Sequence, residues 1–170
     1  MLHVITGGSG SGKSAFAEEQ VLKAGQKKRI YIATMIPYGE EGKQRVERHR
    51  KLRKEKNFDT IECYKNLASV KVPKDSVVLL ECMSNLVANE IFEADGAHEH
   101  TLEAIAEGIH NLLEQAKELF VVTNEVFSDG MEYDSETMRY LKYLGQMNQK
   151  LAVMADRVTE VVYGIPVKIK

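Results

Sequence analysis

Cysteine is scarce in this chain, and its placement fits neither a disulfide framework nor a structural zinc site. Cys63 and Cys82 are the two cysteines, and they form no CxxC pair and no cluster with histidine. Cys82 follows an apolar, strand-like run, so we expect a buried and reduced thiol there.

Long apolar runs and a charge excess are missing as well. No stretch approaches the roughly 18 apolar residues that span a bilayer, and the first residues lack a charged segment followed by an apolar one. We therefore expect no membrane span and a cytoplasmic location. The formal net charge of −2 gives no electrostatic reason to expect DNA or RNA as a partner.

The chain does contain a regular alternation of strand-like and helix-like segments. Its 170 residues suggest one domain, 1–170, with a core of its own. The expected strands are 2–6, 29–33, 60–64, 77–80, 119–123, 158–163 and 167–169, and the expected helices are 14–24, 40–56, 83–92, 97–117 and 135–154. This order predicts an α/β fold with a mostly parallel central sheet flanked by helices. Ligands of such sheets bind beyond the carboxyl ends of the strands.

A phosphate-binding loop is expected directly after the first strand. The residues that fit G-x-x-x-x-G-K-[ST] are Gly7, Gly8, Ser9, Gly10, Ser11, Gly12, Lys13 and Ser14. Glycines let backbone N–H groups point at phosphate oxygens, and the following helix offers its N-terminal dipole. Lys13 is placed to reach the β- and γ-phosphates. The Ser14 hydroxyl, with the Glu81 carboxylate at the end of an apolar strand, is placed to bind Mg²⁺.

Several classes of phosphate-loop protein are disfavoured. The guanine-reading N-K-x-D and the switch pattern D-x-x-G of regulatory GTPases are both absent from the sequence. Small-molecule kinases remain open, although their arginine-bearing lid usually comes late in the chain, whereas the basic cluster here lies early, in residues 45–53. A RecA-like motor is disfavoured because the chain is short and lacks nucleic-acid-binding charge.

The basic cluster has one feature of chemical interest. At helical spacing Arg45, His49 and Arg53 share a face. Arginines beside a histidine favour its neutral form, which is a nucleophile, and they can hold a triphosphate against it. From spacing alone, a solvated charged face is the more common explanation.

The ordered motifs resemble the bifunctional adenosylcobinamide kinase / adenosylcobinamide-phosphate guanylyltransferase family of cobalamin biosynthesis, over nearly the whole chain. The matching segments are Ile5-Thr6-Gly7-Gly8, Ser11-Gly12-Lys13-Ser14, Tyr31-Ile32-Ala33-Thr34, Arg45-Val46-Glu47-Arg48-His49-Arg50 with Arg53, Thr60-Ile61-Glu62, Leu79-Leu80-Glu81-Cys82 with Asn85 and Asn89, Val122-Thr123-Asn124-Glu125-Val126, Asn148-Gln149, Ala155-Asp156, and Gly164-Ile165-Pro166-Val167-Lys168.

This resemblance implies a RecA-like phosphate-loop domain, a homotrimer and two activities. One phosphorylates adenosylcobinamide with ATP or GTP, and the other transfers GMP from GTP to the phosphorylated corrinoid through a guanylyl-histidine. His49 matches the family's nucleophile. Beyond the loop, the nucleotide contacts implied by the resemblance are Thr34, Met35, Ile36, Arg50, Lys51, Leu52, Arg53, Glu62 and Glu81.

The sequence departs from the family at two places. Many members carry an Arg-Pro pair and a tryptophan after the histidine helix, where this chain has Arg53-Lys54 and Phe58. Ser9 and Gly10 stand where Ala-Arg is common, which removes a possible cationic contact from the phosphate loop. The alternatives to the bifunctional enzyme are a monofunctional small-molecule kinase, in which His49 belongs to a basic phosphate clamp, and a non-catalytic nucleotide-binding regulator.

Overall fold

The protein is described by a computed structural model that covers residues 1–25 and 28–170. The strands are β1 (Leu2–Thr6), β2 (Arg29–Ala33), β3 (Phe58–Glu62), β4 (Val77–Glu81), β5 (Glu118–Val122), β6 (Arg157–Val162) and β7 (Ile165–Lys168). The α-helices are α1 (Lys13–Lys23), α2 (Gly39–Glu55), α3 (Met83–Phe92), α4 (Thr101–Gln115) and α5 (Ser135–Met154), and short 3₁₀ turns are η1 (Leu67–Ser69) and η2 (His98–His100).

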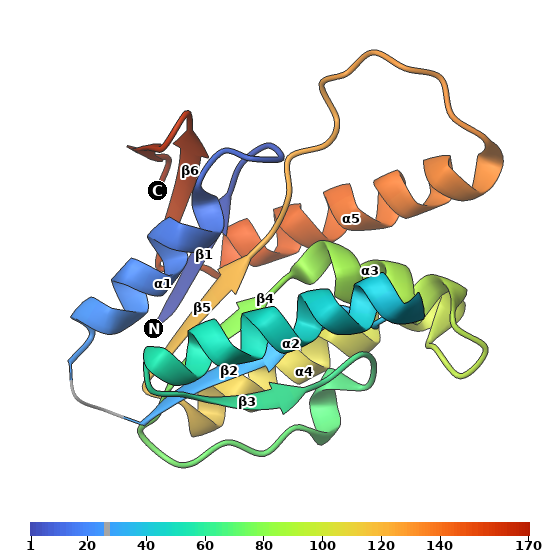
Figure 1. The fold of residues 1–170 in the computed structure, drawn as a ribbon. Coiled ribbons are helices and arrows are strands. Elements are labelled where there is room, and N and C mark those ends of the chain that lie inside the picture. The colour runs from blue at the N-terminus through green and yellow to red at the C-terminus, as the bar shows by residue number, and fades with distance from the viewer. Residues whose placement is uncertain (26–27) are drawn as a thin grey trace.

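The strands form a single mostly parallel sheet with helices on both faces (Figure 1). Its order is β3-β2-β4-β5-β1-β6-β7, in which β6 and β7 pair antiparallel and the other neighbours pair parallel. This architecture confirms the α/β prediction. Because the parallel strands share one direction, the segments that follow β1, β2, β4 and β5 emerge at the same edge of the sheet.

Two apolar clusters, one on each face of the sheet, hold the layers together. One cluster contains Ala17 and Val21 of α1 against Ile5, Tyr31 and Leu79 of the strands. The other joins the opposite strand side chains to buried residues of α3, α4 and α5. α2 lies on the α1 side, where an ion pair joins Lys56, just after α2, to Glu18 of α1. The sheet therefore has α1 and α2 on one face and α3, α4 and α5 on the other.

The differences from the expected elements lie at their ends. The expected helix 97–117 is the short turn η2 followed by α4, and His98, the first residue of η2, adopts φ +49°. The expected strand 60–64 begins two residues earlier, at Phe58, which pairs with Arg29 of β2. The segment 40–56, expected as an exposed or partly ordered helix, is the helix α2. Cys82 is half-buried instead of buried, and both cysteines are free thiols.

Gly108 in α4 marks a close approach between two elements and yields a stability prediction. A Cβ at this position would lie 2.6 Å from Leu67 Cβ in η1, closer than real carbon atoms pack. Gly108→Ala should therefore lower the free energy of unfolding by about 1–3 kcal/mol through overpacking, although alanine is the better helix former. Urea unfolding followed by circular dichroism measures this.

Gly145 in α5 is the matched control. A Cβ there meets the Phe127 ring at 3.6 Å, an ordinary contact. Gly145→Ala should raise the free energy of unfolding by about 0.5–1 kcal/mol. Equal effects of the two substitutions would contradict the close packing of α4 against η1.

Candidate active site

The phosphate loop lies between β1 and the first turn of α1, as its sequence pattern requires. Gly10 and Gly12 adopt φ +70° and +89°, a region that favours glycine, so the chain can curl before the helix begins. Lys13 is 8% exposed, and its Nζ donates a 3.0 Å hydrogen bond to the Gly8 carbonyl. The ammonium is thus held within the loop, at the N-terminus of α1, where phosphate oxygens would bind.

Glu81 ends β4 and accepts a hydrogen bond from the Tyr31 hydroxyl of neighbouring β2. Burial, followed by the nearby Glu81 charge, raises the pKa of the Tyr31 hydroxyl. Tyr31 therefore remains a hydrogen-bond donor at neutral pH and fixes the position of the Glu81 carboxylate. The sequence places Tyr31 in a strand and in a family-matching segment but assigns it no contact, because its bond to Glu81 depends on the pairing of β2 with β4.

Thr34 is fully buried at the end of β2, and its hydroxyl and carbonyl groups form hydrogen bonds within the protein. Its hydroxyl accepts from the Cys82 N–H at 2.8 Å and donates to the Cys82 carbonyl at 2.9 Å. Its carbonyl accepts a 2.8 Å hydrogen bond from the buried Asn89 amide. Thr34 thus fixes the start of the segment that carries Met35 and Ile36, two of the predicted nucleotide contacts.

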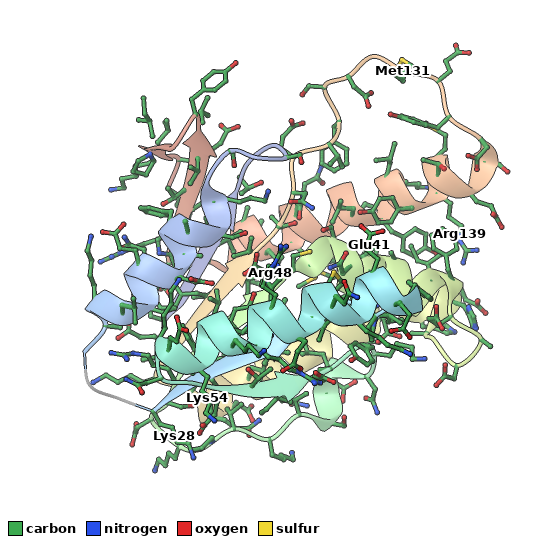
Figure 2. The ribbon with its side chains drawn as sticks, in the orientation of Figure 1. Lys28, Glu41, Arg48, Lys54, Met131 and Arg139 are labelled. Carbon is green, nitrogen blue, oxygen red and sulfur yellow. The ribbon has the colours of Figure 1, made fainter. Side chains whose placement is uncertain are left out.

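Helix α2 presents two faces of different character. Glu41, Arg48 and Lys54 are exposed along it (Figure 2). In contrast, Arg53 is 8% exposed, and its guanidinium lies 3.8 Å from the centroid of the Tyr31 ring. Arg53 Nε and Nη1 are buried and have no hydrogen-bond partner among the described residues. The buried face of α2 therefore carries a cation that stacks on β2, with two N–H groups that donate to no described residue.

His49 lies one helical turn before Arg53, and the charges of Arg53 and Glu81 both act on its imidazole. Partial burial lowers the pKa of its imidazole, the Arg53 charge lowers it further, and Glu81 opposes the shift. The side chain nevertheless remains exposed enough to be reached from solvent. At neutral pH the imidazole is thus uncharged, which is the form that can attack phosphorus. This agrees with the expectation drawn from the flanking arginines.

Arg50, another predicted nucleotide contact of α2, is paired with Glu62, which is also a predicted contact. Arg50 donates to Glu62 at the end of β3, and the Tyr64 hydroxyl donates to the same carboxylate at 2.9 Å. Burial raises the pKa of Glu62, but these two hydrogen bonds outweigh it, so that the net shift is downward and the carboxylate stays ionised. Lys51 is exposed on the outer surface, and the side chains of Arg45 and Leu52 lie outside the described part.

A polar chain to which sequence patterns assign no role lines the carboxyl ends of β4 and β5. The Asn124 amide donates to Ser84 Oγ at 2.7 Å, and the Asn148 amide donates to the Asn124 carbonyl at 3.2 Å. The Thr123 hydroxyl donates to Asn148 Oδ1 at 2.6 Å. Thr123, Asn124 and Ser84 follow strands in the sequence, which is the signal by which they could have been found.

The oxygen donors of Ser14 and Glu81 suit a hard cation such as Mg²⁺. Among residues 1–25 and 28–170, no three His, Cys, Asp or Glu side chains gather into a site that could hold a metal alone. Nucleotide-bound Mg²⁺ usually takes ligands from the phosphates and from water besides one or two protein oxygens.

Comparison with known proteins identifies the family. Residues 3–169 match the family described as cobinamide kinase / cobinamide phosphate guanyltransferase. The chain belongs to this family. It is 34% identical to the bifunctional adenosylcobalamin biosynthesis protein CobU of Escherichia coli K12 and 32% identical to CobU of Salmonella typhimurium LT2, and each alignment covers all of both chains. CobP of Pseudomonas aeruginosa is 27% identical over the whole of this chain and 98% of its own length.

The similarity of this chain to solved structures concerns the fold alone. A KaiC-like protein of Pyrococcus horikoshii superposes with a TM-score of 0.52 at 12% identity, over 94% of this chain and 71% of that one. The flagellar accessory protein FlaH of Methanocaldococcus jannaschii gives 0.50 at 14% identity, over 99% and 77%. These neighbours confirm the RecA-like phosphate-loop architecture expected for this family member.

In the described part of the chain no helix is both long enough and apolar enough to cross a bilayer.

Because the charge of Arg53 lowers the pKa of His49, a substitution of Arg53 should change that pKa measurably. His49 should titrate below the ordinary range of histidine, and Arg53→Met should move its pKa upward, because a nearby cation disfavours protonation. NMR titration of the histidine ring signals measures both values, with His49→Asn to assign the signal.

Arg139→Met is the control, because Arg139 stacks 5.7 Å from the Tyr143 ring on α5 and should leave His49 unchanged. If Arg53→Met fails to raise the pKa of His49, the two side chains do not share one face of α2.

Proposed function

We propose that this protein phosphorylates adenosylcobinamide and then guanylylates the product, giving adenosylcobinamide-GDP for cobalamin biosynthesis. The observation that carries the proposal is the match of residues 3–169 to a family described by these two activities, with full-length relatives named bifunctional. The phosphate loop, the Glu81 carboxylate beside Tyr31 and the lowered pKa of His49 support it.

In the kinase step, the hydroxyl oxygen of the aminopropanol arm attacks the γ-phosphorus of ATP or GTP. The bond from that phosphorus to the bridging oxygen breaks, the nucleoside diphosphate leaves, and the hydroxyl proton passes to a base or to water. Gly7–Ser14 would cradle the phosphates, and Lys13 would neutralise the charge that develops on them. Mg²⁺, held by Ser14 and Glu81 together with phosphate oxygens, would supply further charge neutralisation.

In the guanylyl step, an imidazole nitrogen of His49 attacks the α-phosphorus of GTP, and pyrophosphate leaves. A phosphate oxygen of adenosylcobinamide phosphate then attacks the same phosphorus, the P–N bond breaks, and the imidazole regains its electron pair. Splitting the transfer in this way replaces one difficult step by two easier ones. The low pKa of His49 supports its role because the imidazole is already neutral when GTP binds.

The monofunctional kinase remains the second candidate, because the basic face of α2 could also act as a phosphate clamp. The two candidates differ in whether GTP leaves GMP covalently on the protein. We further propose a homotrimer in the cytoplasm. The trimer rests on the family resemblance and is supported by exposed apolar side chains of the β6–β7 hairpin, where Tyr163 is 94% exposed and Ile165 65%.

Covalent labelling tests the guanylyl step. GTP labelled at the α-phosphate should label the protein, and GTP labelled at the γ-phosphate should not, because pyrophosphate leaves. The label should be lost in acid and kept in alkali, as expected for a P–N bond. His49→Asn should abolish the label while keeping much of the kinase activity, which needs no nucleophile on the protein.

The same substitution at His110, an exposed histidine of α4, is the control and should leave labelling unchanged. A labelled His49→Asn protein would place the nucleophile elsewhere. A wild-type protein with kinase activity and no label would favour the monofunctional kinase.

Replacing Lys13 tests the phosphate loop. Lys13→Ala removes the buried cation of the loop, so both activities should fall by about 10²–10³-fold, the usual loss when one preorganised donor to a charged transition state is removed. Lys23→Ala, at the exposed far end of α1, should have no effect. Steady-state rates with circular dichroism as a folding check measure the difference. Near-normal turnover of Lys13→Ala in both assays would remove the phosphate loop from the mechanism.

A further inference from the structure

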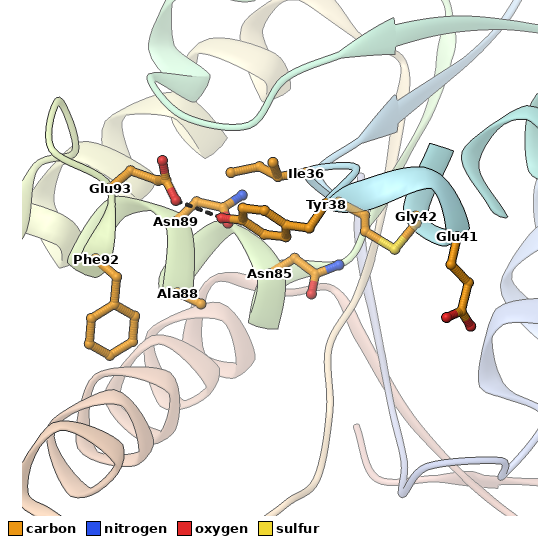
Figure 3. A pocket seen from close by; sticks show the side chains of 10 residues that line it. Ile36, Tyr38, Glu41, Gly42, Asn85, Ala88, Asn89, Phe92 and Glu93 are labelled. Carbon is orange, nitrogen blue, oxygen red and sulfur yellow. Dashed lines mark hydrogen bonds between the residues drawn. The ribbon is translucent and has the colours of Figure 1, made fainter. Parts of the chain in front are cut away.

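A groove runs beside α3 on the side of the sheet edge where the strands end. It consists of two adjoining cavities of about 490 and 520 Å³ that share Ala88 and Phe92 of α3. The first also lies against the segment after β2 and the start of α2, with Tyr38 and Asn85 in its wall (Figure 3). The second continues to the first turns of α5, at Thr137 and Tyr140.

The lining of this groove is apolar with an acidic rim. Met35, Ile36, Ala88 and Phe92 supply apolar surface, and the Phe92 side chain is 48% exposed. The rim carries the carboxylates of Glu41, Glu93, Asp134 and Glu136. No lysine or arginine lines either cavity within the part of the chain that the structure describes. Such a surface repels a polyphosphate and attracts an amphipathic cation.

One end of the groove adjoins the phosphate loop. α3 begins directly after Cys82, at the end of β4. Ser84, in the first turn of α3, accepts a 2.7 Å hydrogen bond from the Asn124 amide, and the next residue, Glu125, donates its backbone N–H to the Gly7 carbonyl of the phosphate loop at 3.1 Å. Asn85, within the first turn of α3, is half-buried, and its side-chain amide bonds to no described residue. The groove thus leads from the expected position of the γ-phosphate, past the Asn85 amide, to the exposed apolar surface.

We propose that this groove binds the corrinoid substrate, with its aminopropanol arm directed past Asn85 to the phosphate loop. The inference rests on the proposed function, which makes a corrinoid the acceptor. Adenosylcobinamide carries one net positive charge, because cobalt(III) is balanced by a corrin monoanion and an adenosyl carbanion. Its ring offers broad apolar faces, and its edge bears amides that can pair with Asn85. The acidic rim complements that charge.

Two variants test the groove without touching the predicted nucleotide contacts. Phe92→Ala removes exposed apolar surface. The double variant Glu41→Gln with Glu93→Gln removes two negative charges, while the new amide at the second position can still accept from the Tyr38 hydroxyl. Each variant should raise the KM for adenosylcobinamide about tenfold, since a lost apolar contact or charge pair in a binding site has effects of this size. The KM for GTP and the guanylylation of His49 without acceptor should not change.

Matched controls lie away from the groove. Val153→Ala truncates an apolar side chain that is 80% exposed near the end of α5, and Glu107→Gln with Glu114→Gln removes two exposed carboxylates from α4. Neither should change the KM for adenosylcobinamide. Cobyric acid, which has the corrin ring without the aminopropanol arm, should compete with adenosylcobinamide and not with GTP.

The possible results distinguish a failure of the proposed binding groove from a failure of the proposed function. An unchanged KM for adenosylcobinamide in both groove variants overturns the groove. A lower KM for GTP in the double glutamine variant also overturns it, because loss of negative charge would then favour a polyphosphate bound there. If the wild-type protein has neither activity, the proposed function fails. Equilibrium dialysis of cobinamide against wild-type protein and Phe92→Ala then decides the groove alone, and equal affinities overturn it.

Discussion

Parallel pairing of β4 between β2 and β5 is the constraint on which the site depends. Ala33, Glu81 and Val122 lie at one register across these strands, and Ile5 of β1 aligns with Val122. The strand interiors are apolar and covered on both faces, so polar groups can reach a ligand only beyond the strand ends. The phosphate loop, Thr34, Glu81 and Asn124 meet for this reason, although they are far apart in the chain.

Much of the fold could be predicted because its signals are local. The run Val77–Glu81 is a continuous apolar strand, and its four apolar residues are fully buried, as that pattern indicates. The first and last residues of an element were less predictable where the geometry of one short turn determines where the element begins. The Thr101 hydroxyl donates to the His98 carbonyl at 2.6 Å and His98 has a positive φ, so the turn η2 stands in place of the first turn of the expected helix, and α4 begins at Thr101. β3 lies at the sheet edge, where the residues after the buried Phe58 are exposed or half-buried, so no apolar run marks the strand.

The site, like the fold, has parts that local sequence signals predict and parts that they do not. The glycines and Lys13 were predictable because loop and helix are adjacent in sequence, and the common face of His49 and Arg53 follows from helical spacing. The stacking of Arg53 on Tyr31 and the bond from Tyr31 to Glu81 depend on which strands are neighbours, and no spacing encodes this. Nor does any pattern in the sequence tell that the Thr34 side chain faces Cys82 instead of solvent. Family resemblance supplied the importance of these positions, and the structure supplies the physical reason.

The same constraint explains why a net charge of −2 says little about the ligands. A protein that joins a nucleoside triphosphate to a corrinoid must hold an anion and a cation next to each other. The cations Lys13 and Arg53 lie on the side of the sheet edge formed by α1 and α2, whereas Glu93 and Glu136 lie beside α3 and α5. Apart from Glu41 at the start of α2, the two charge patterns therefore lie on different helices, yet both reach the edge where the strands finish. Opposite charges that cancel in composition are therefore separated in space, and each attracts one of the two substrates to the same phosphate loop.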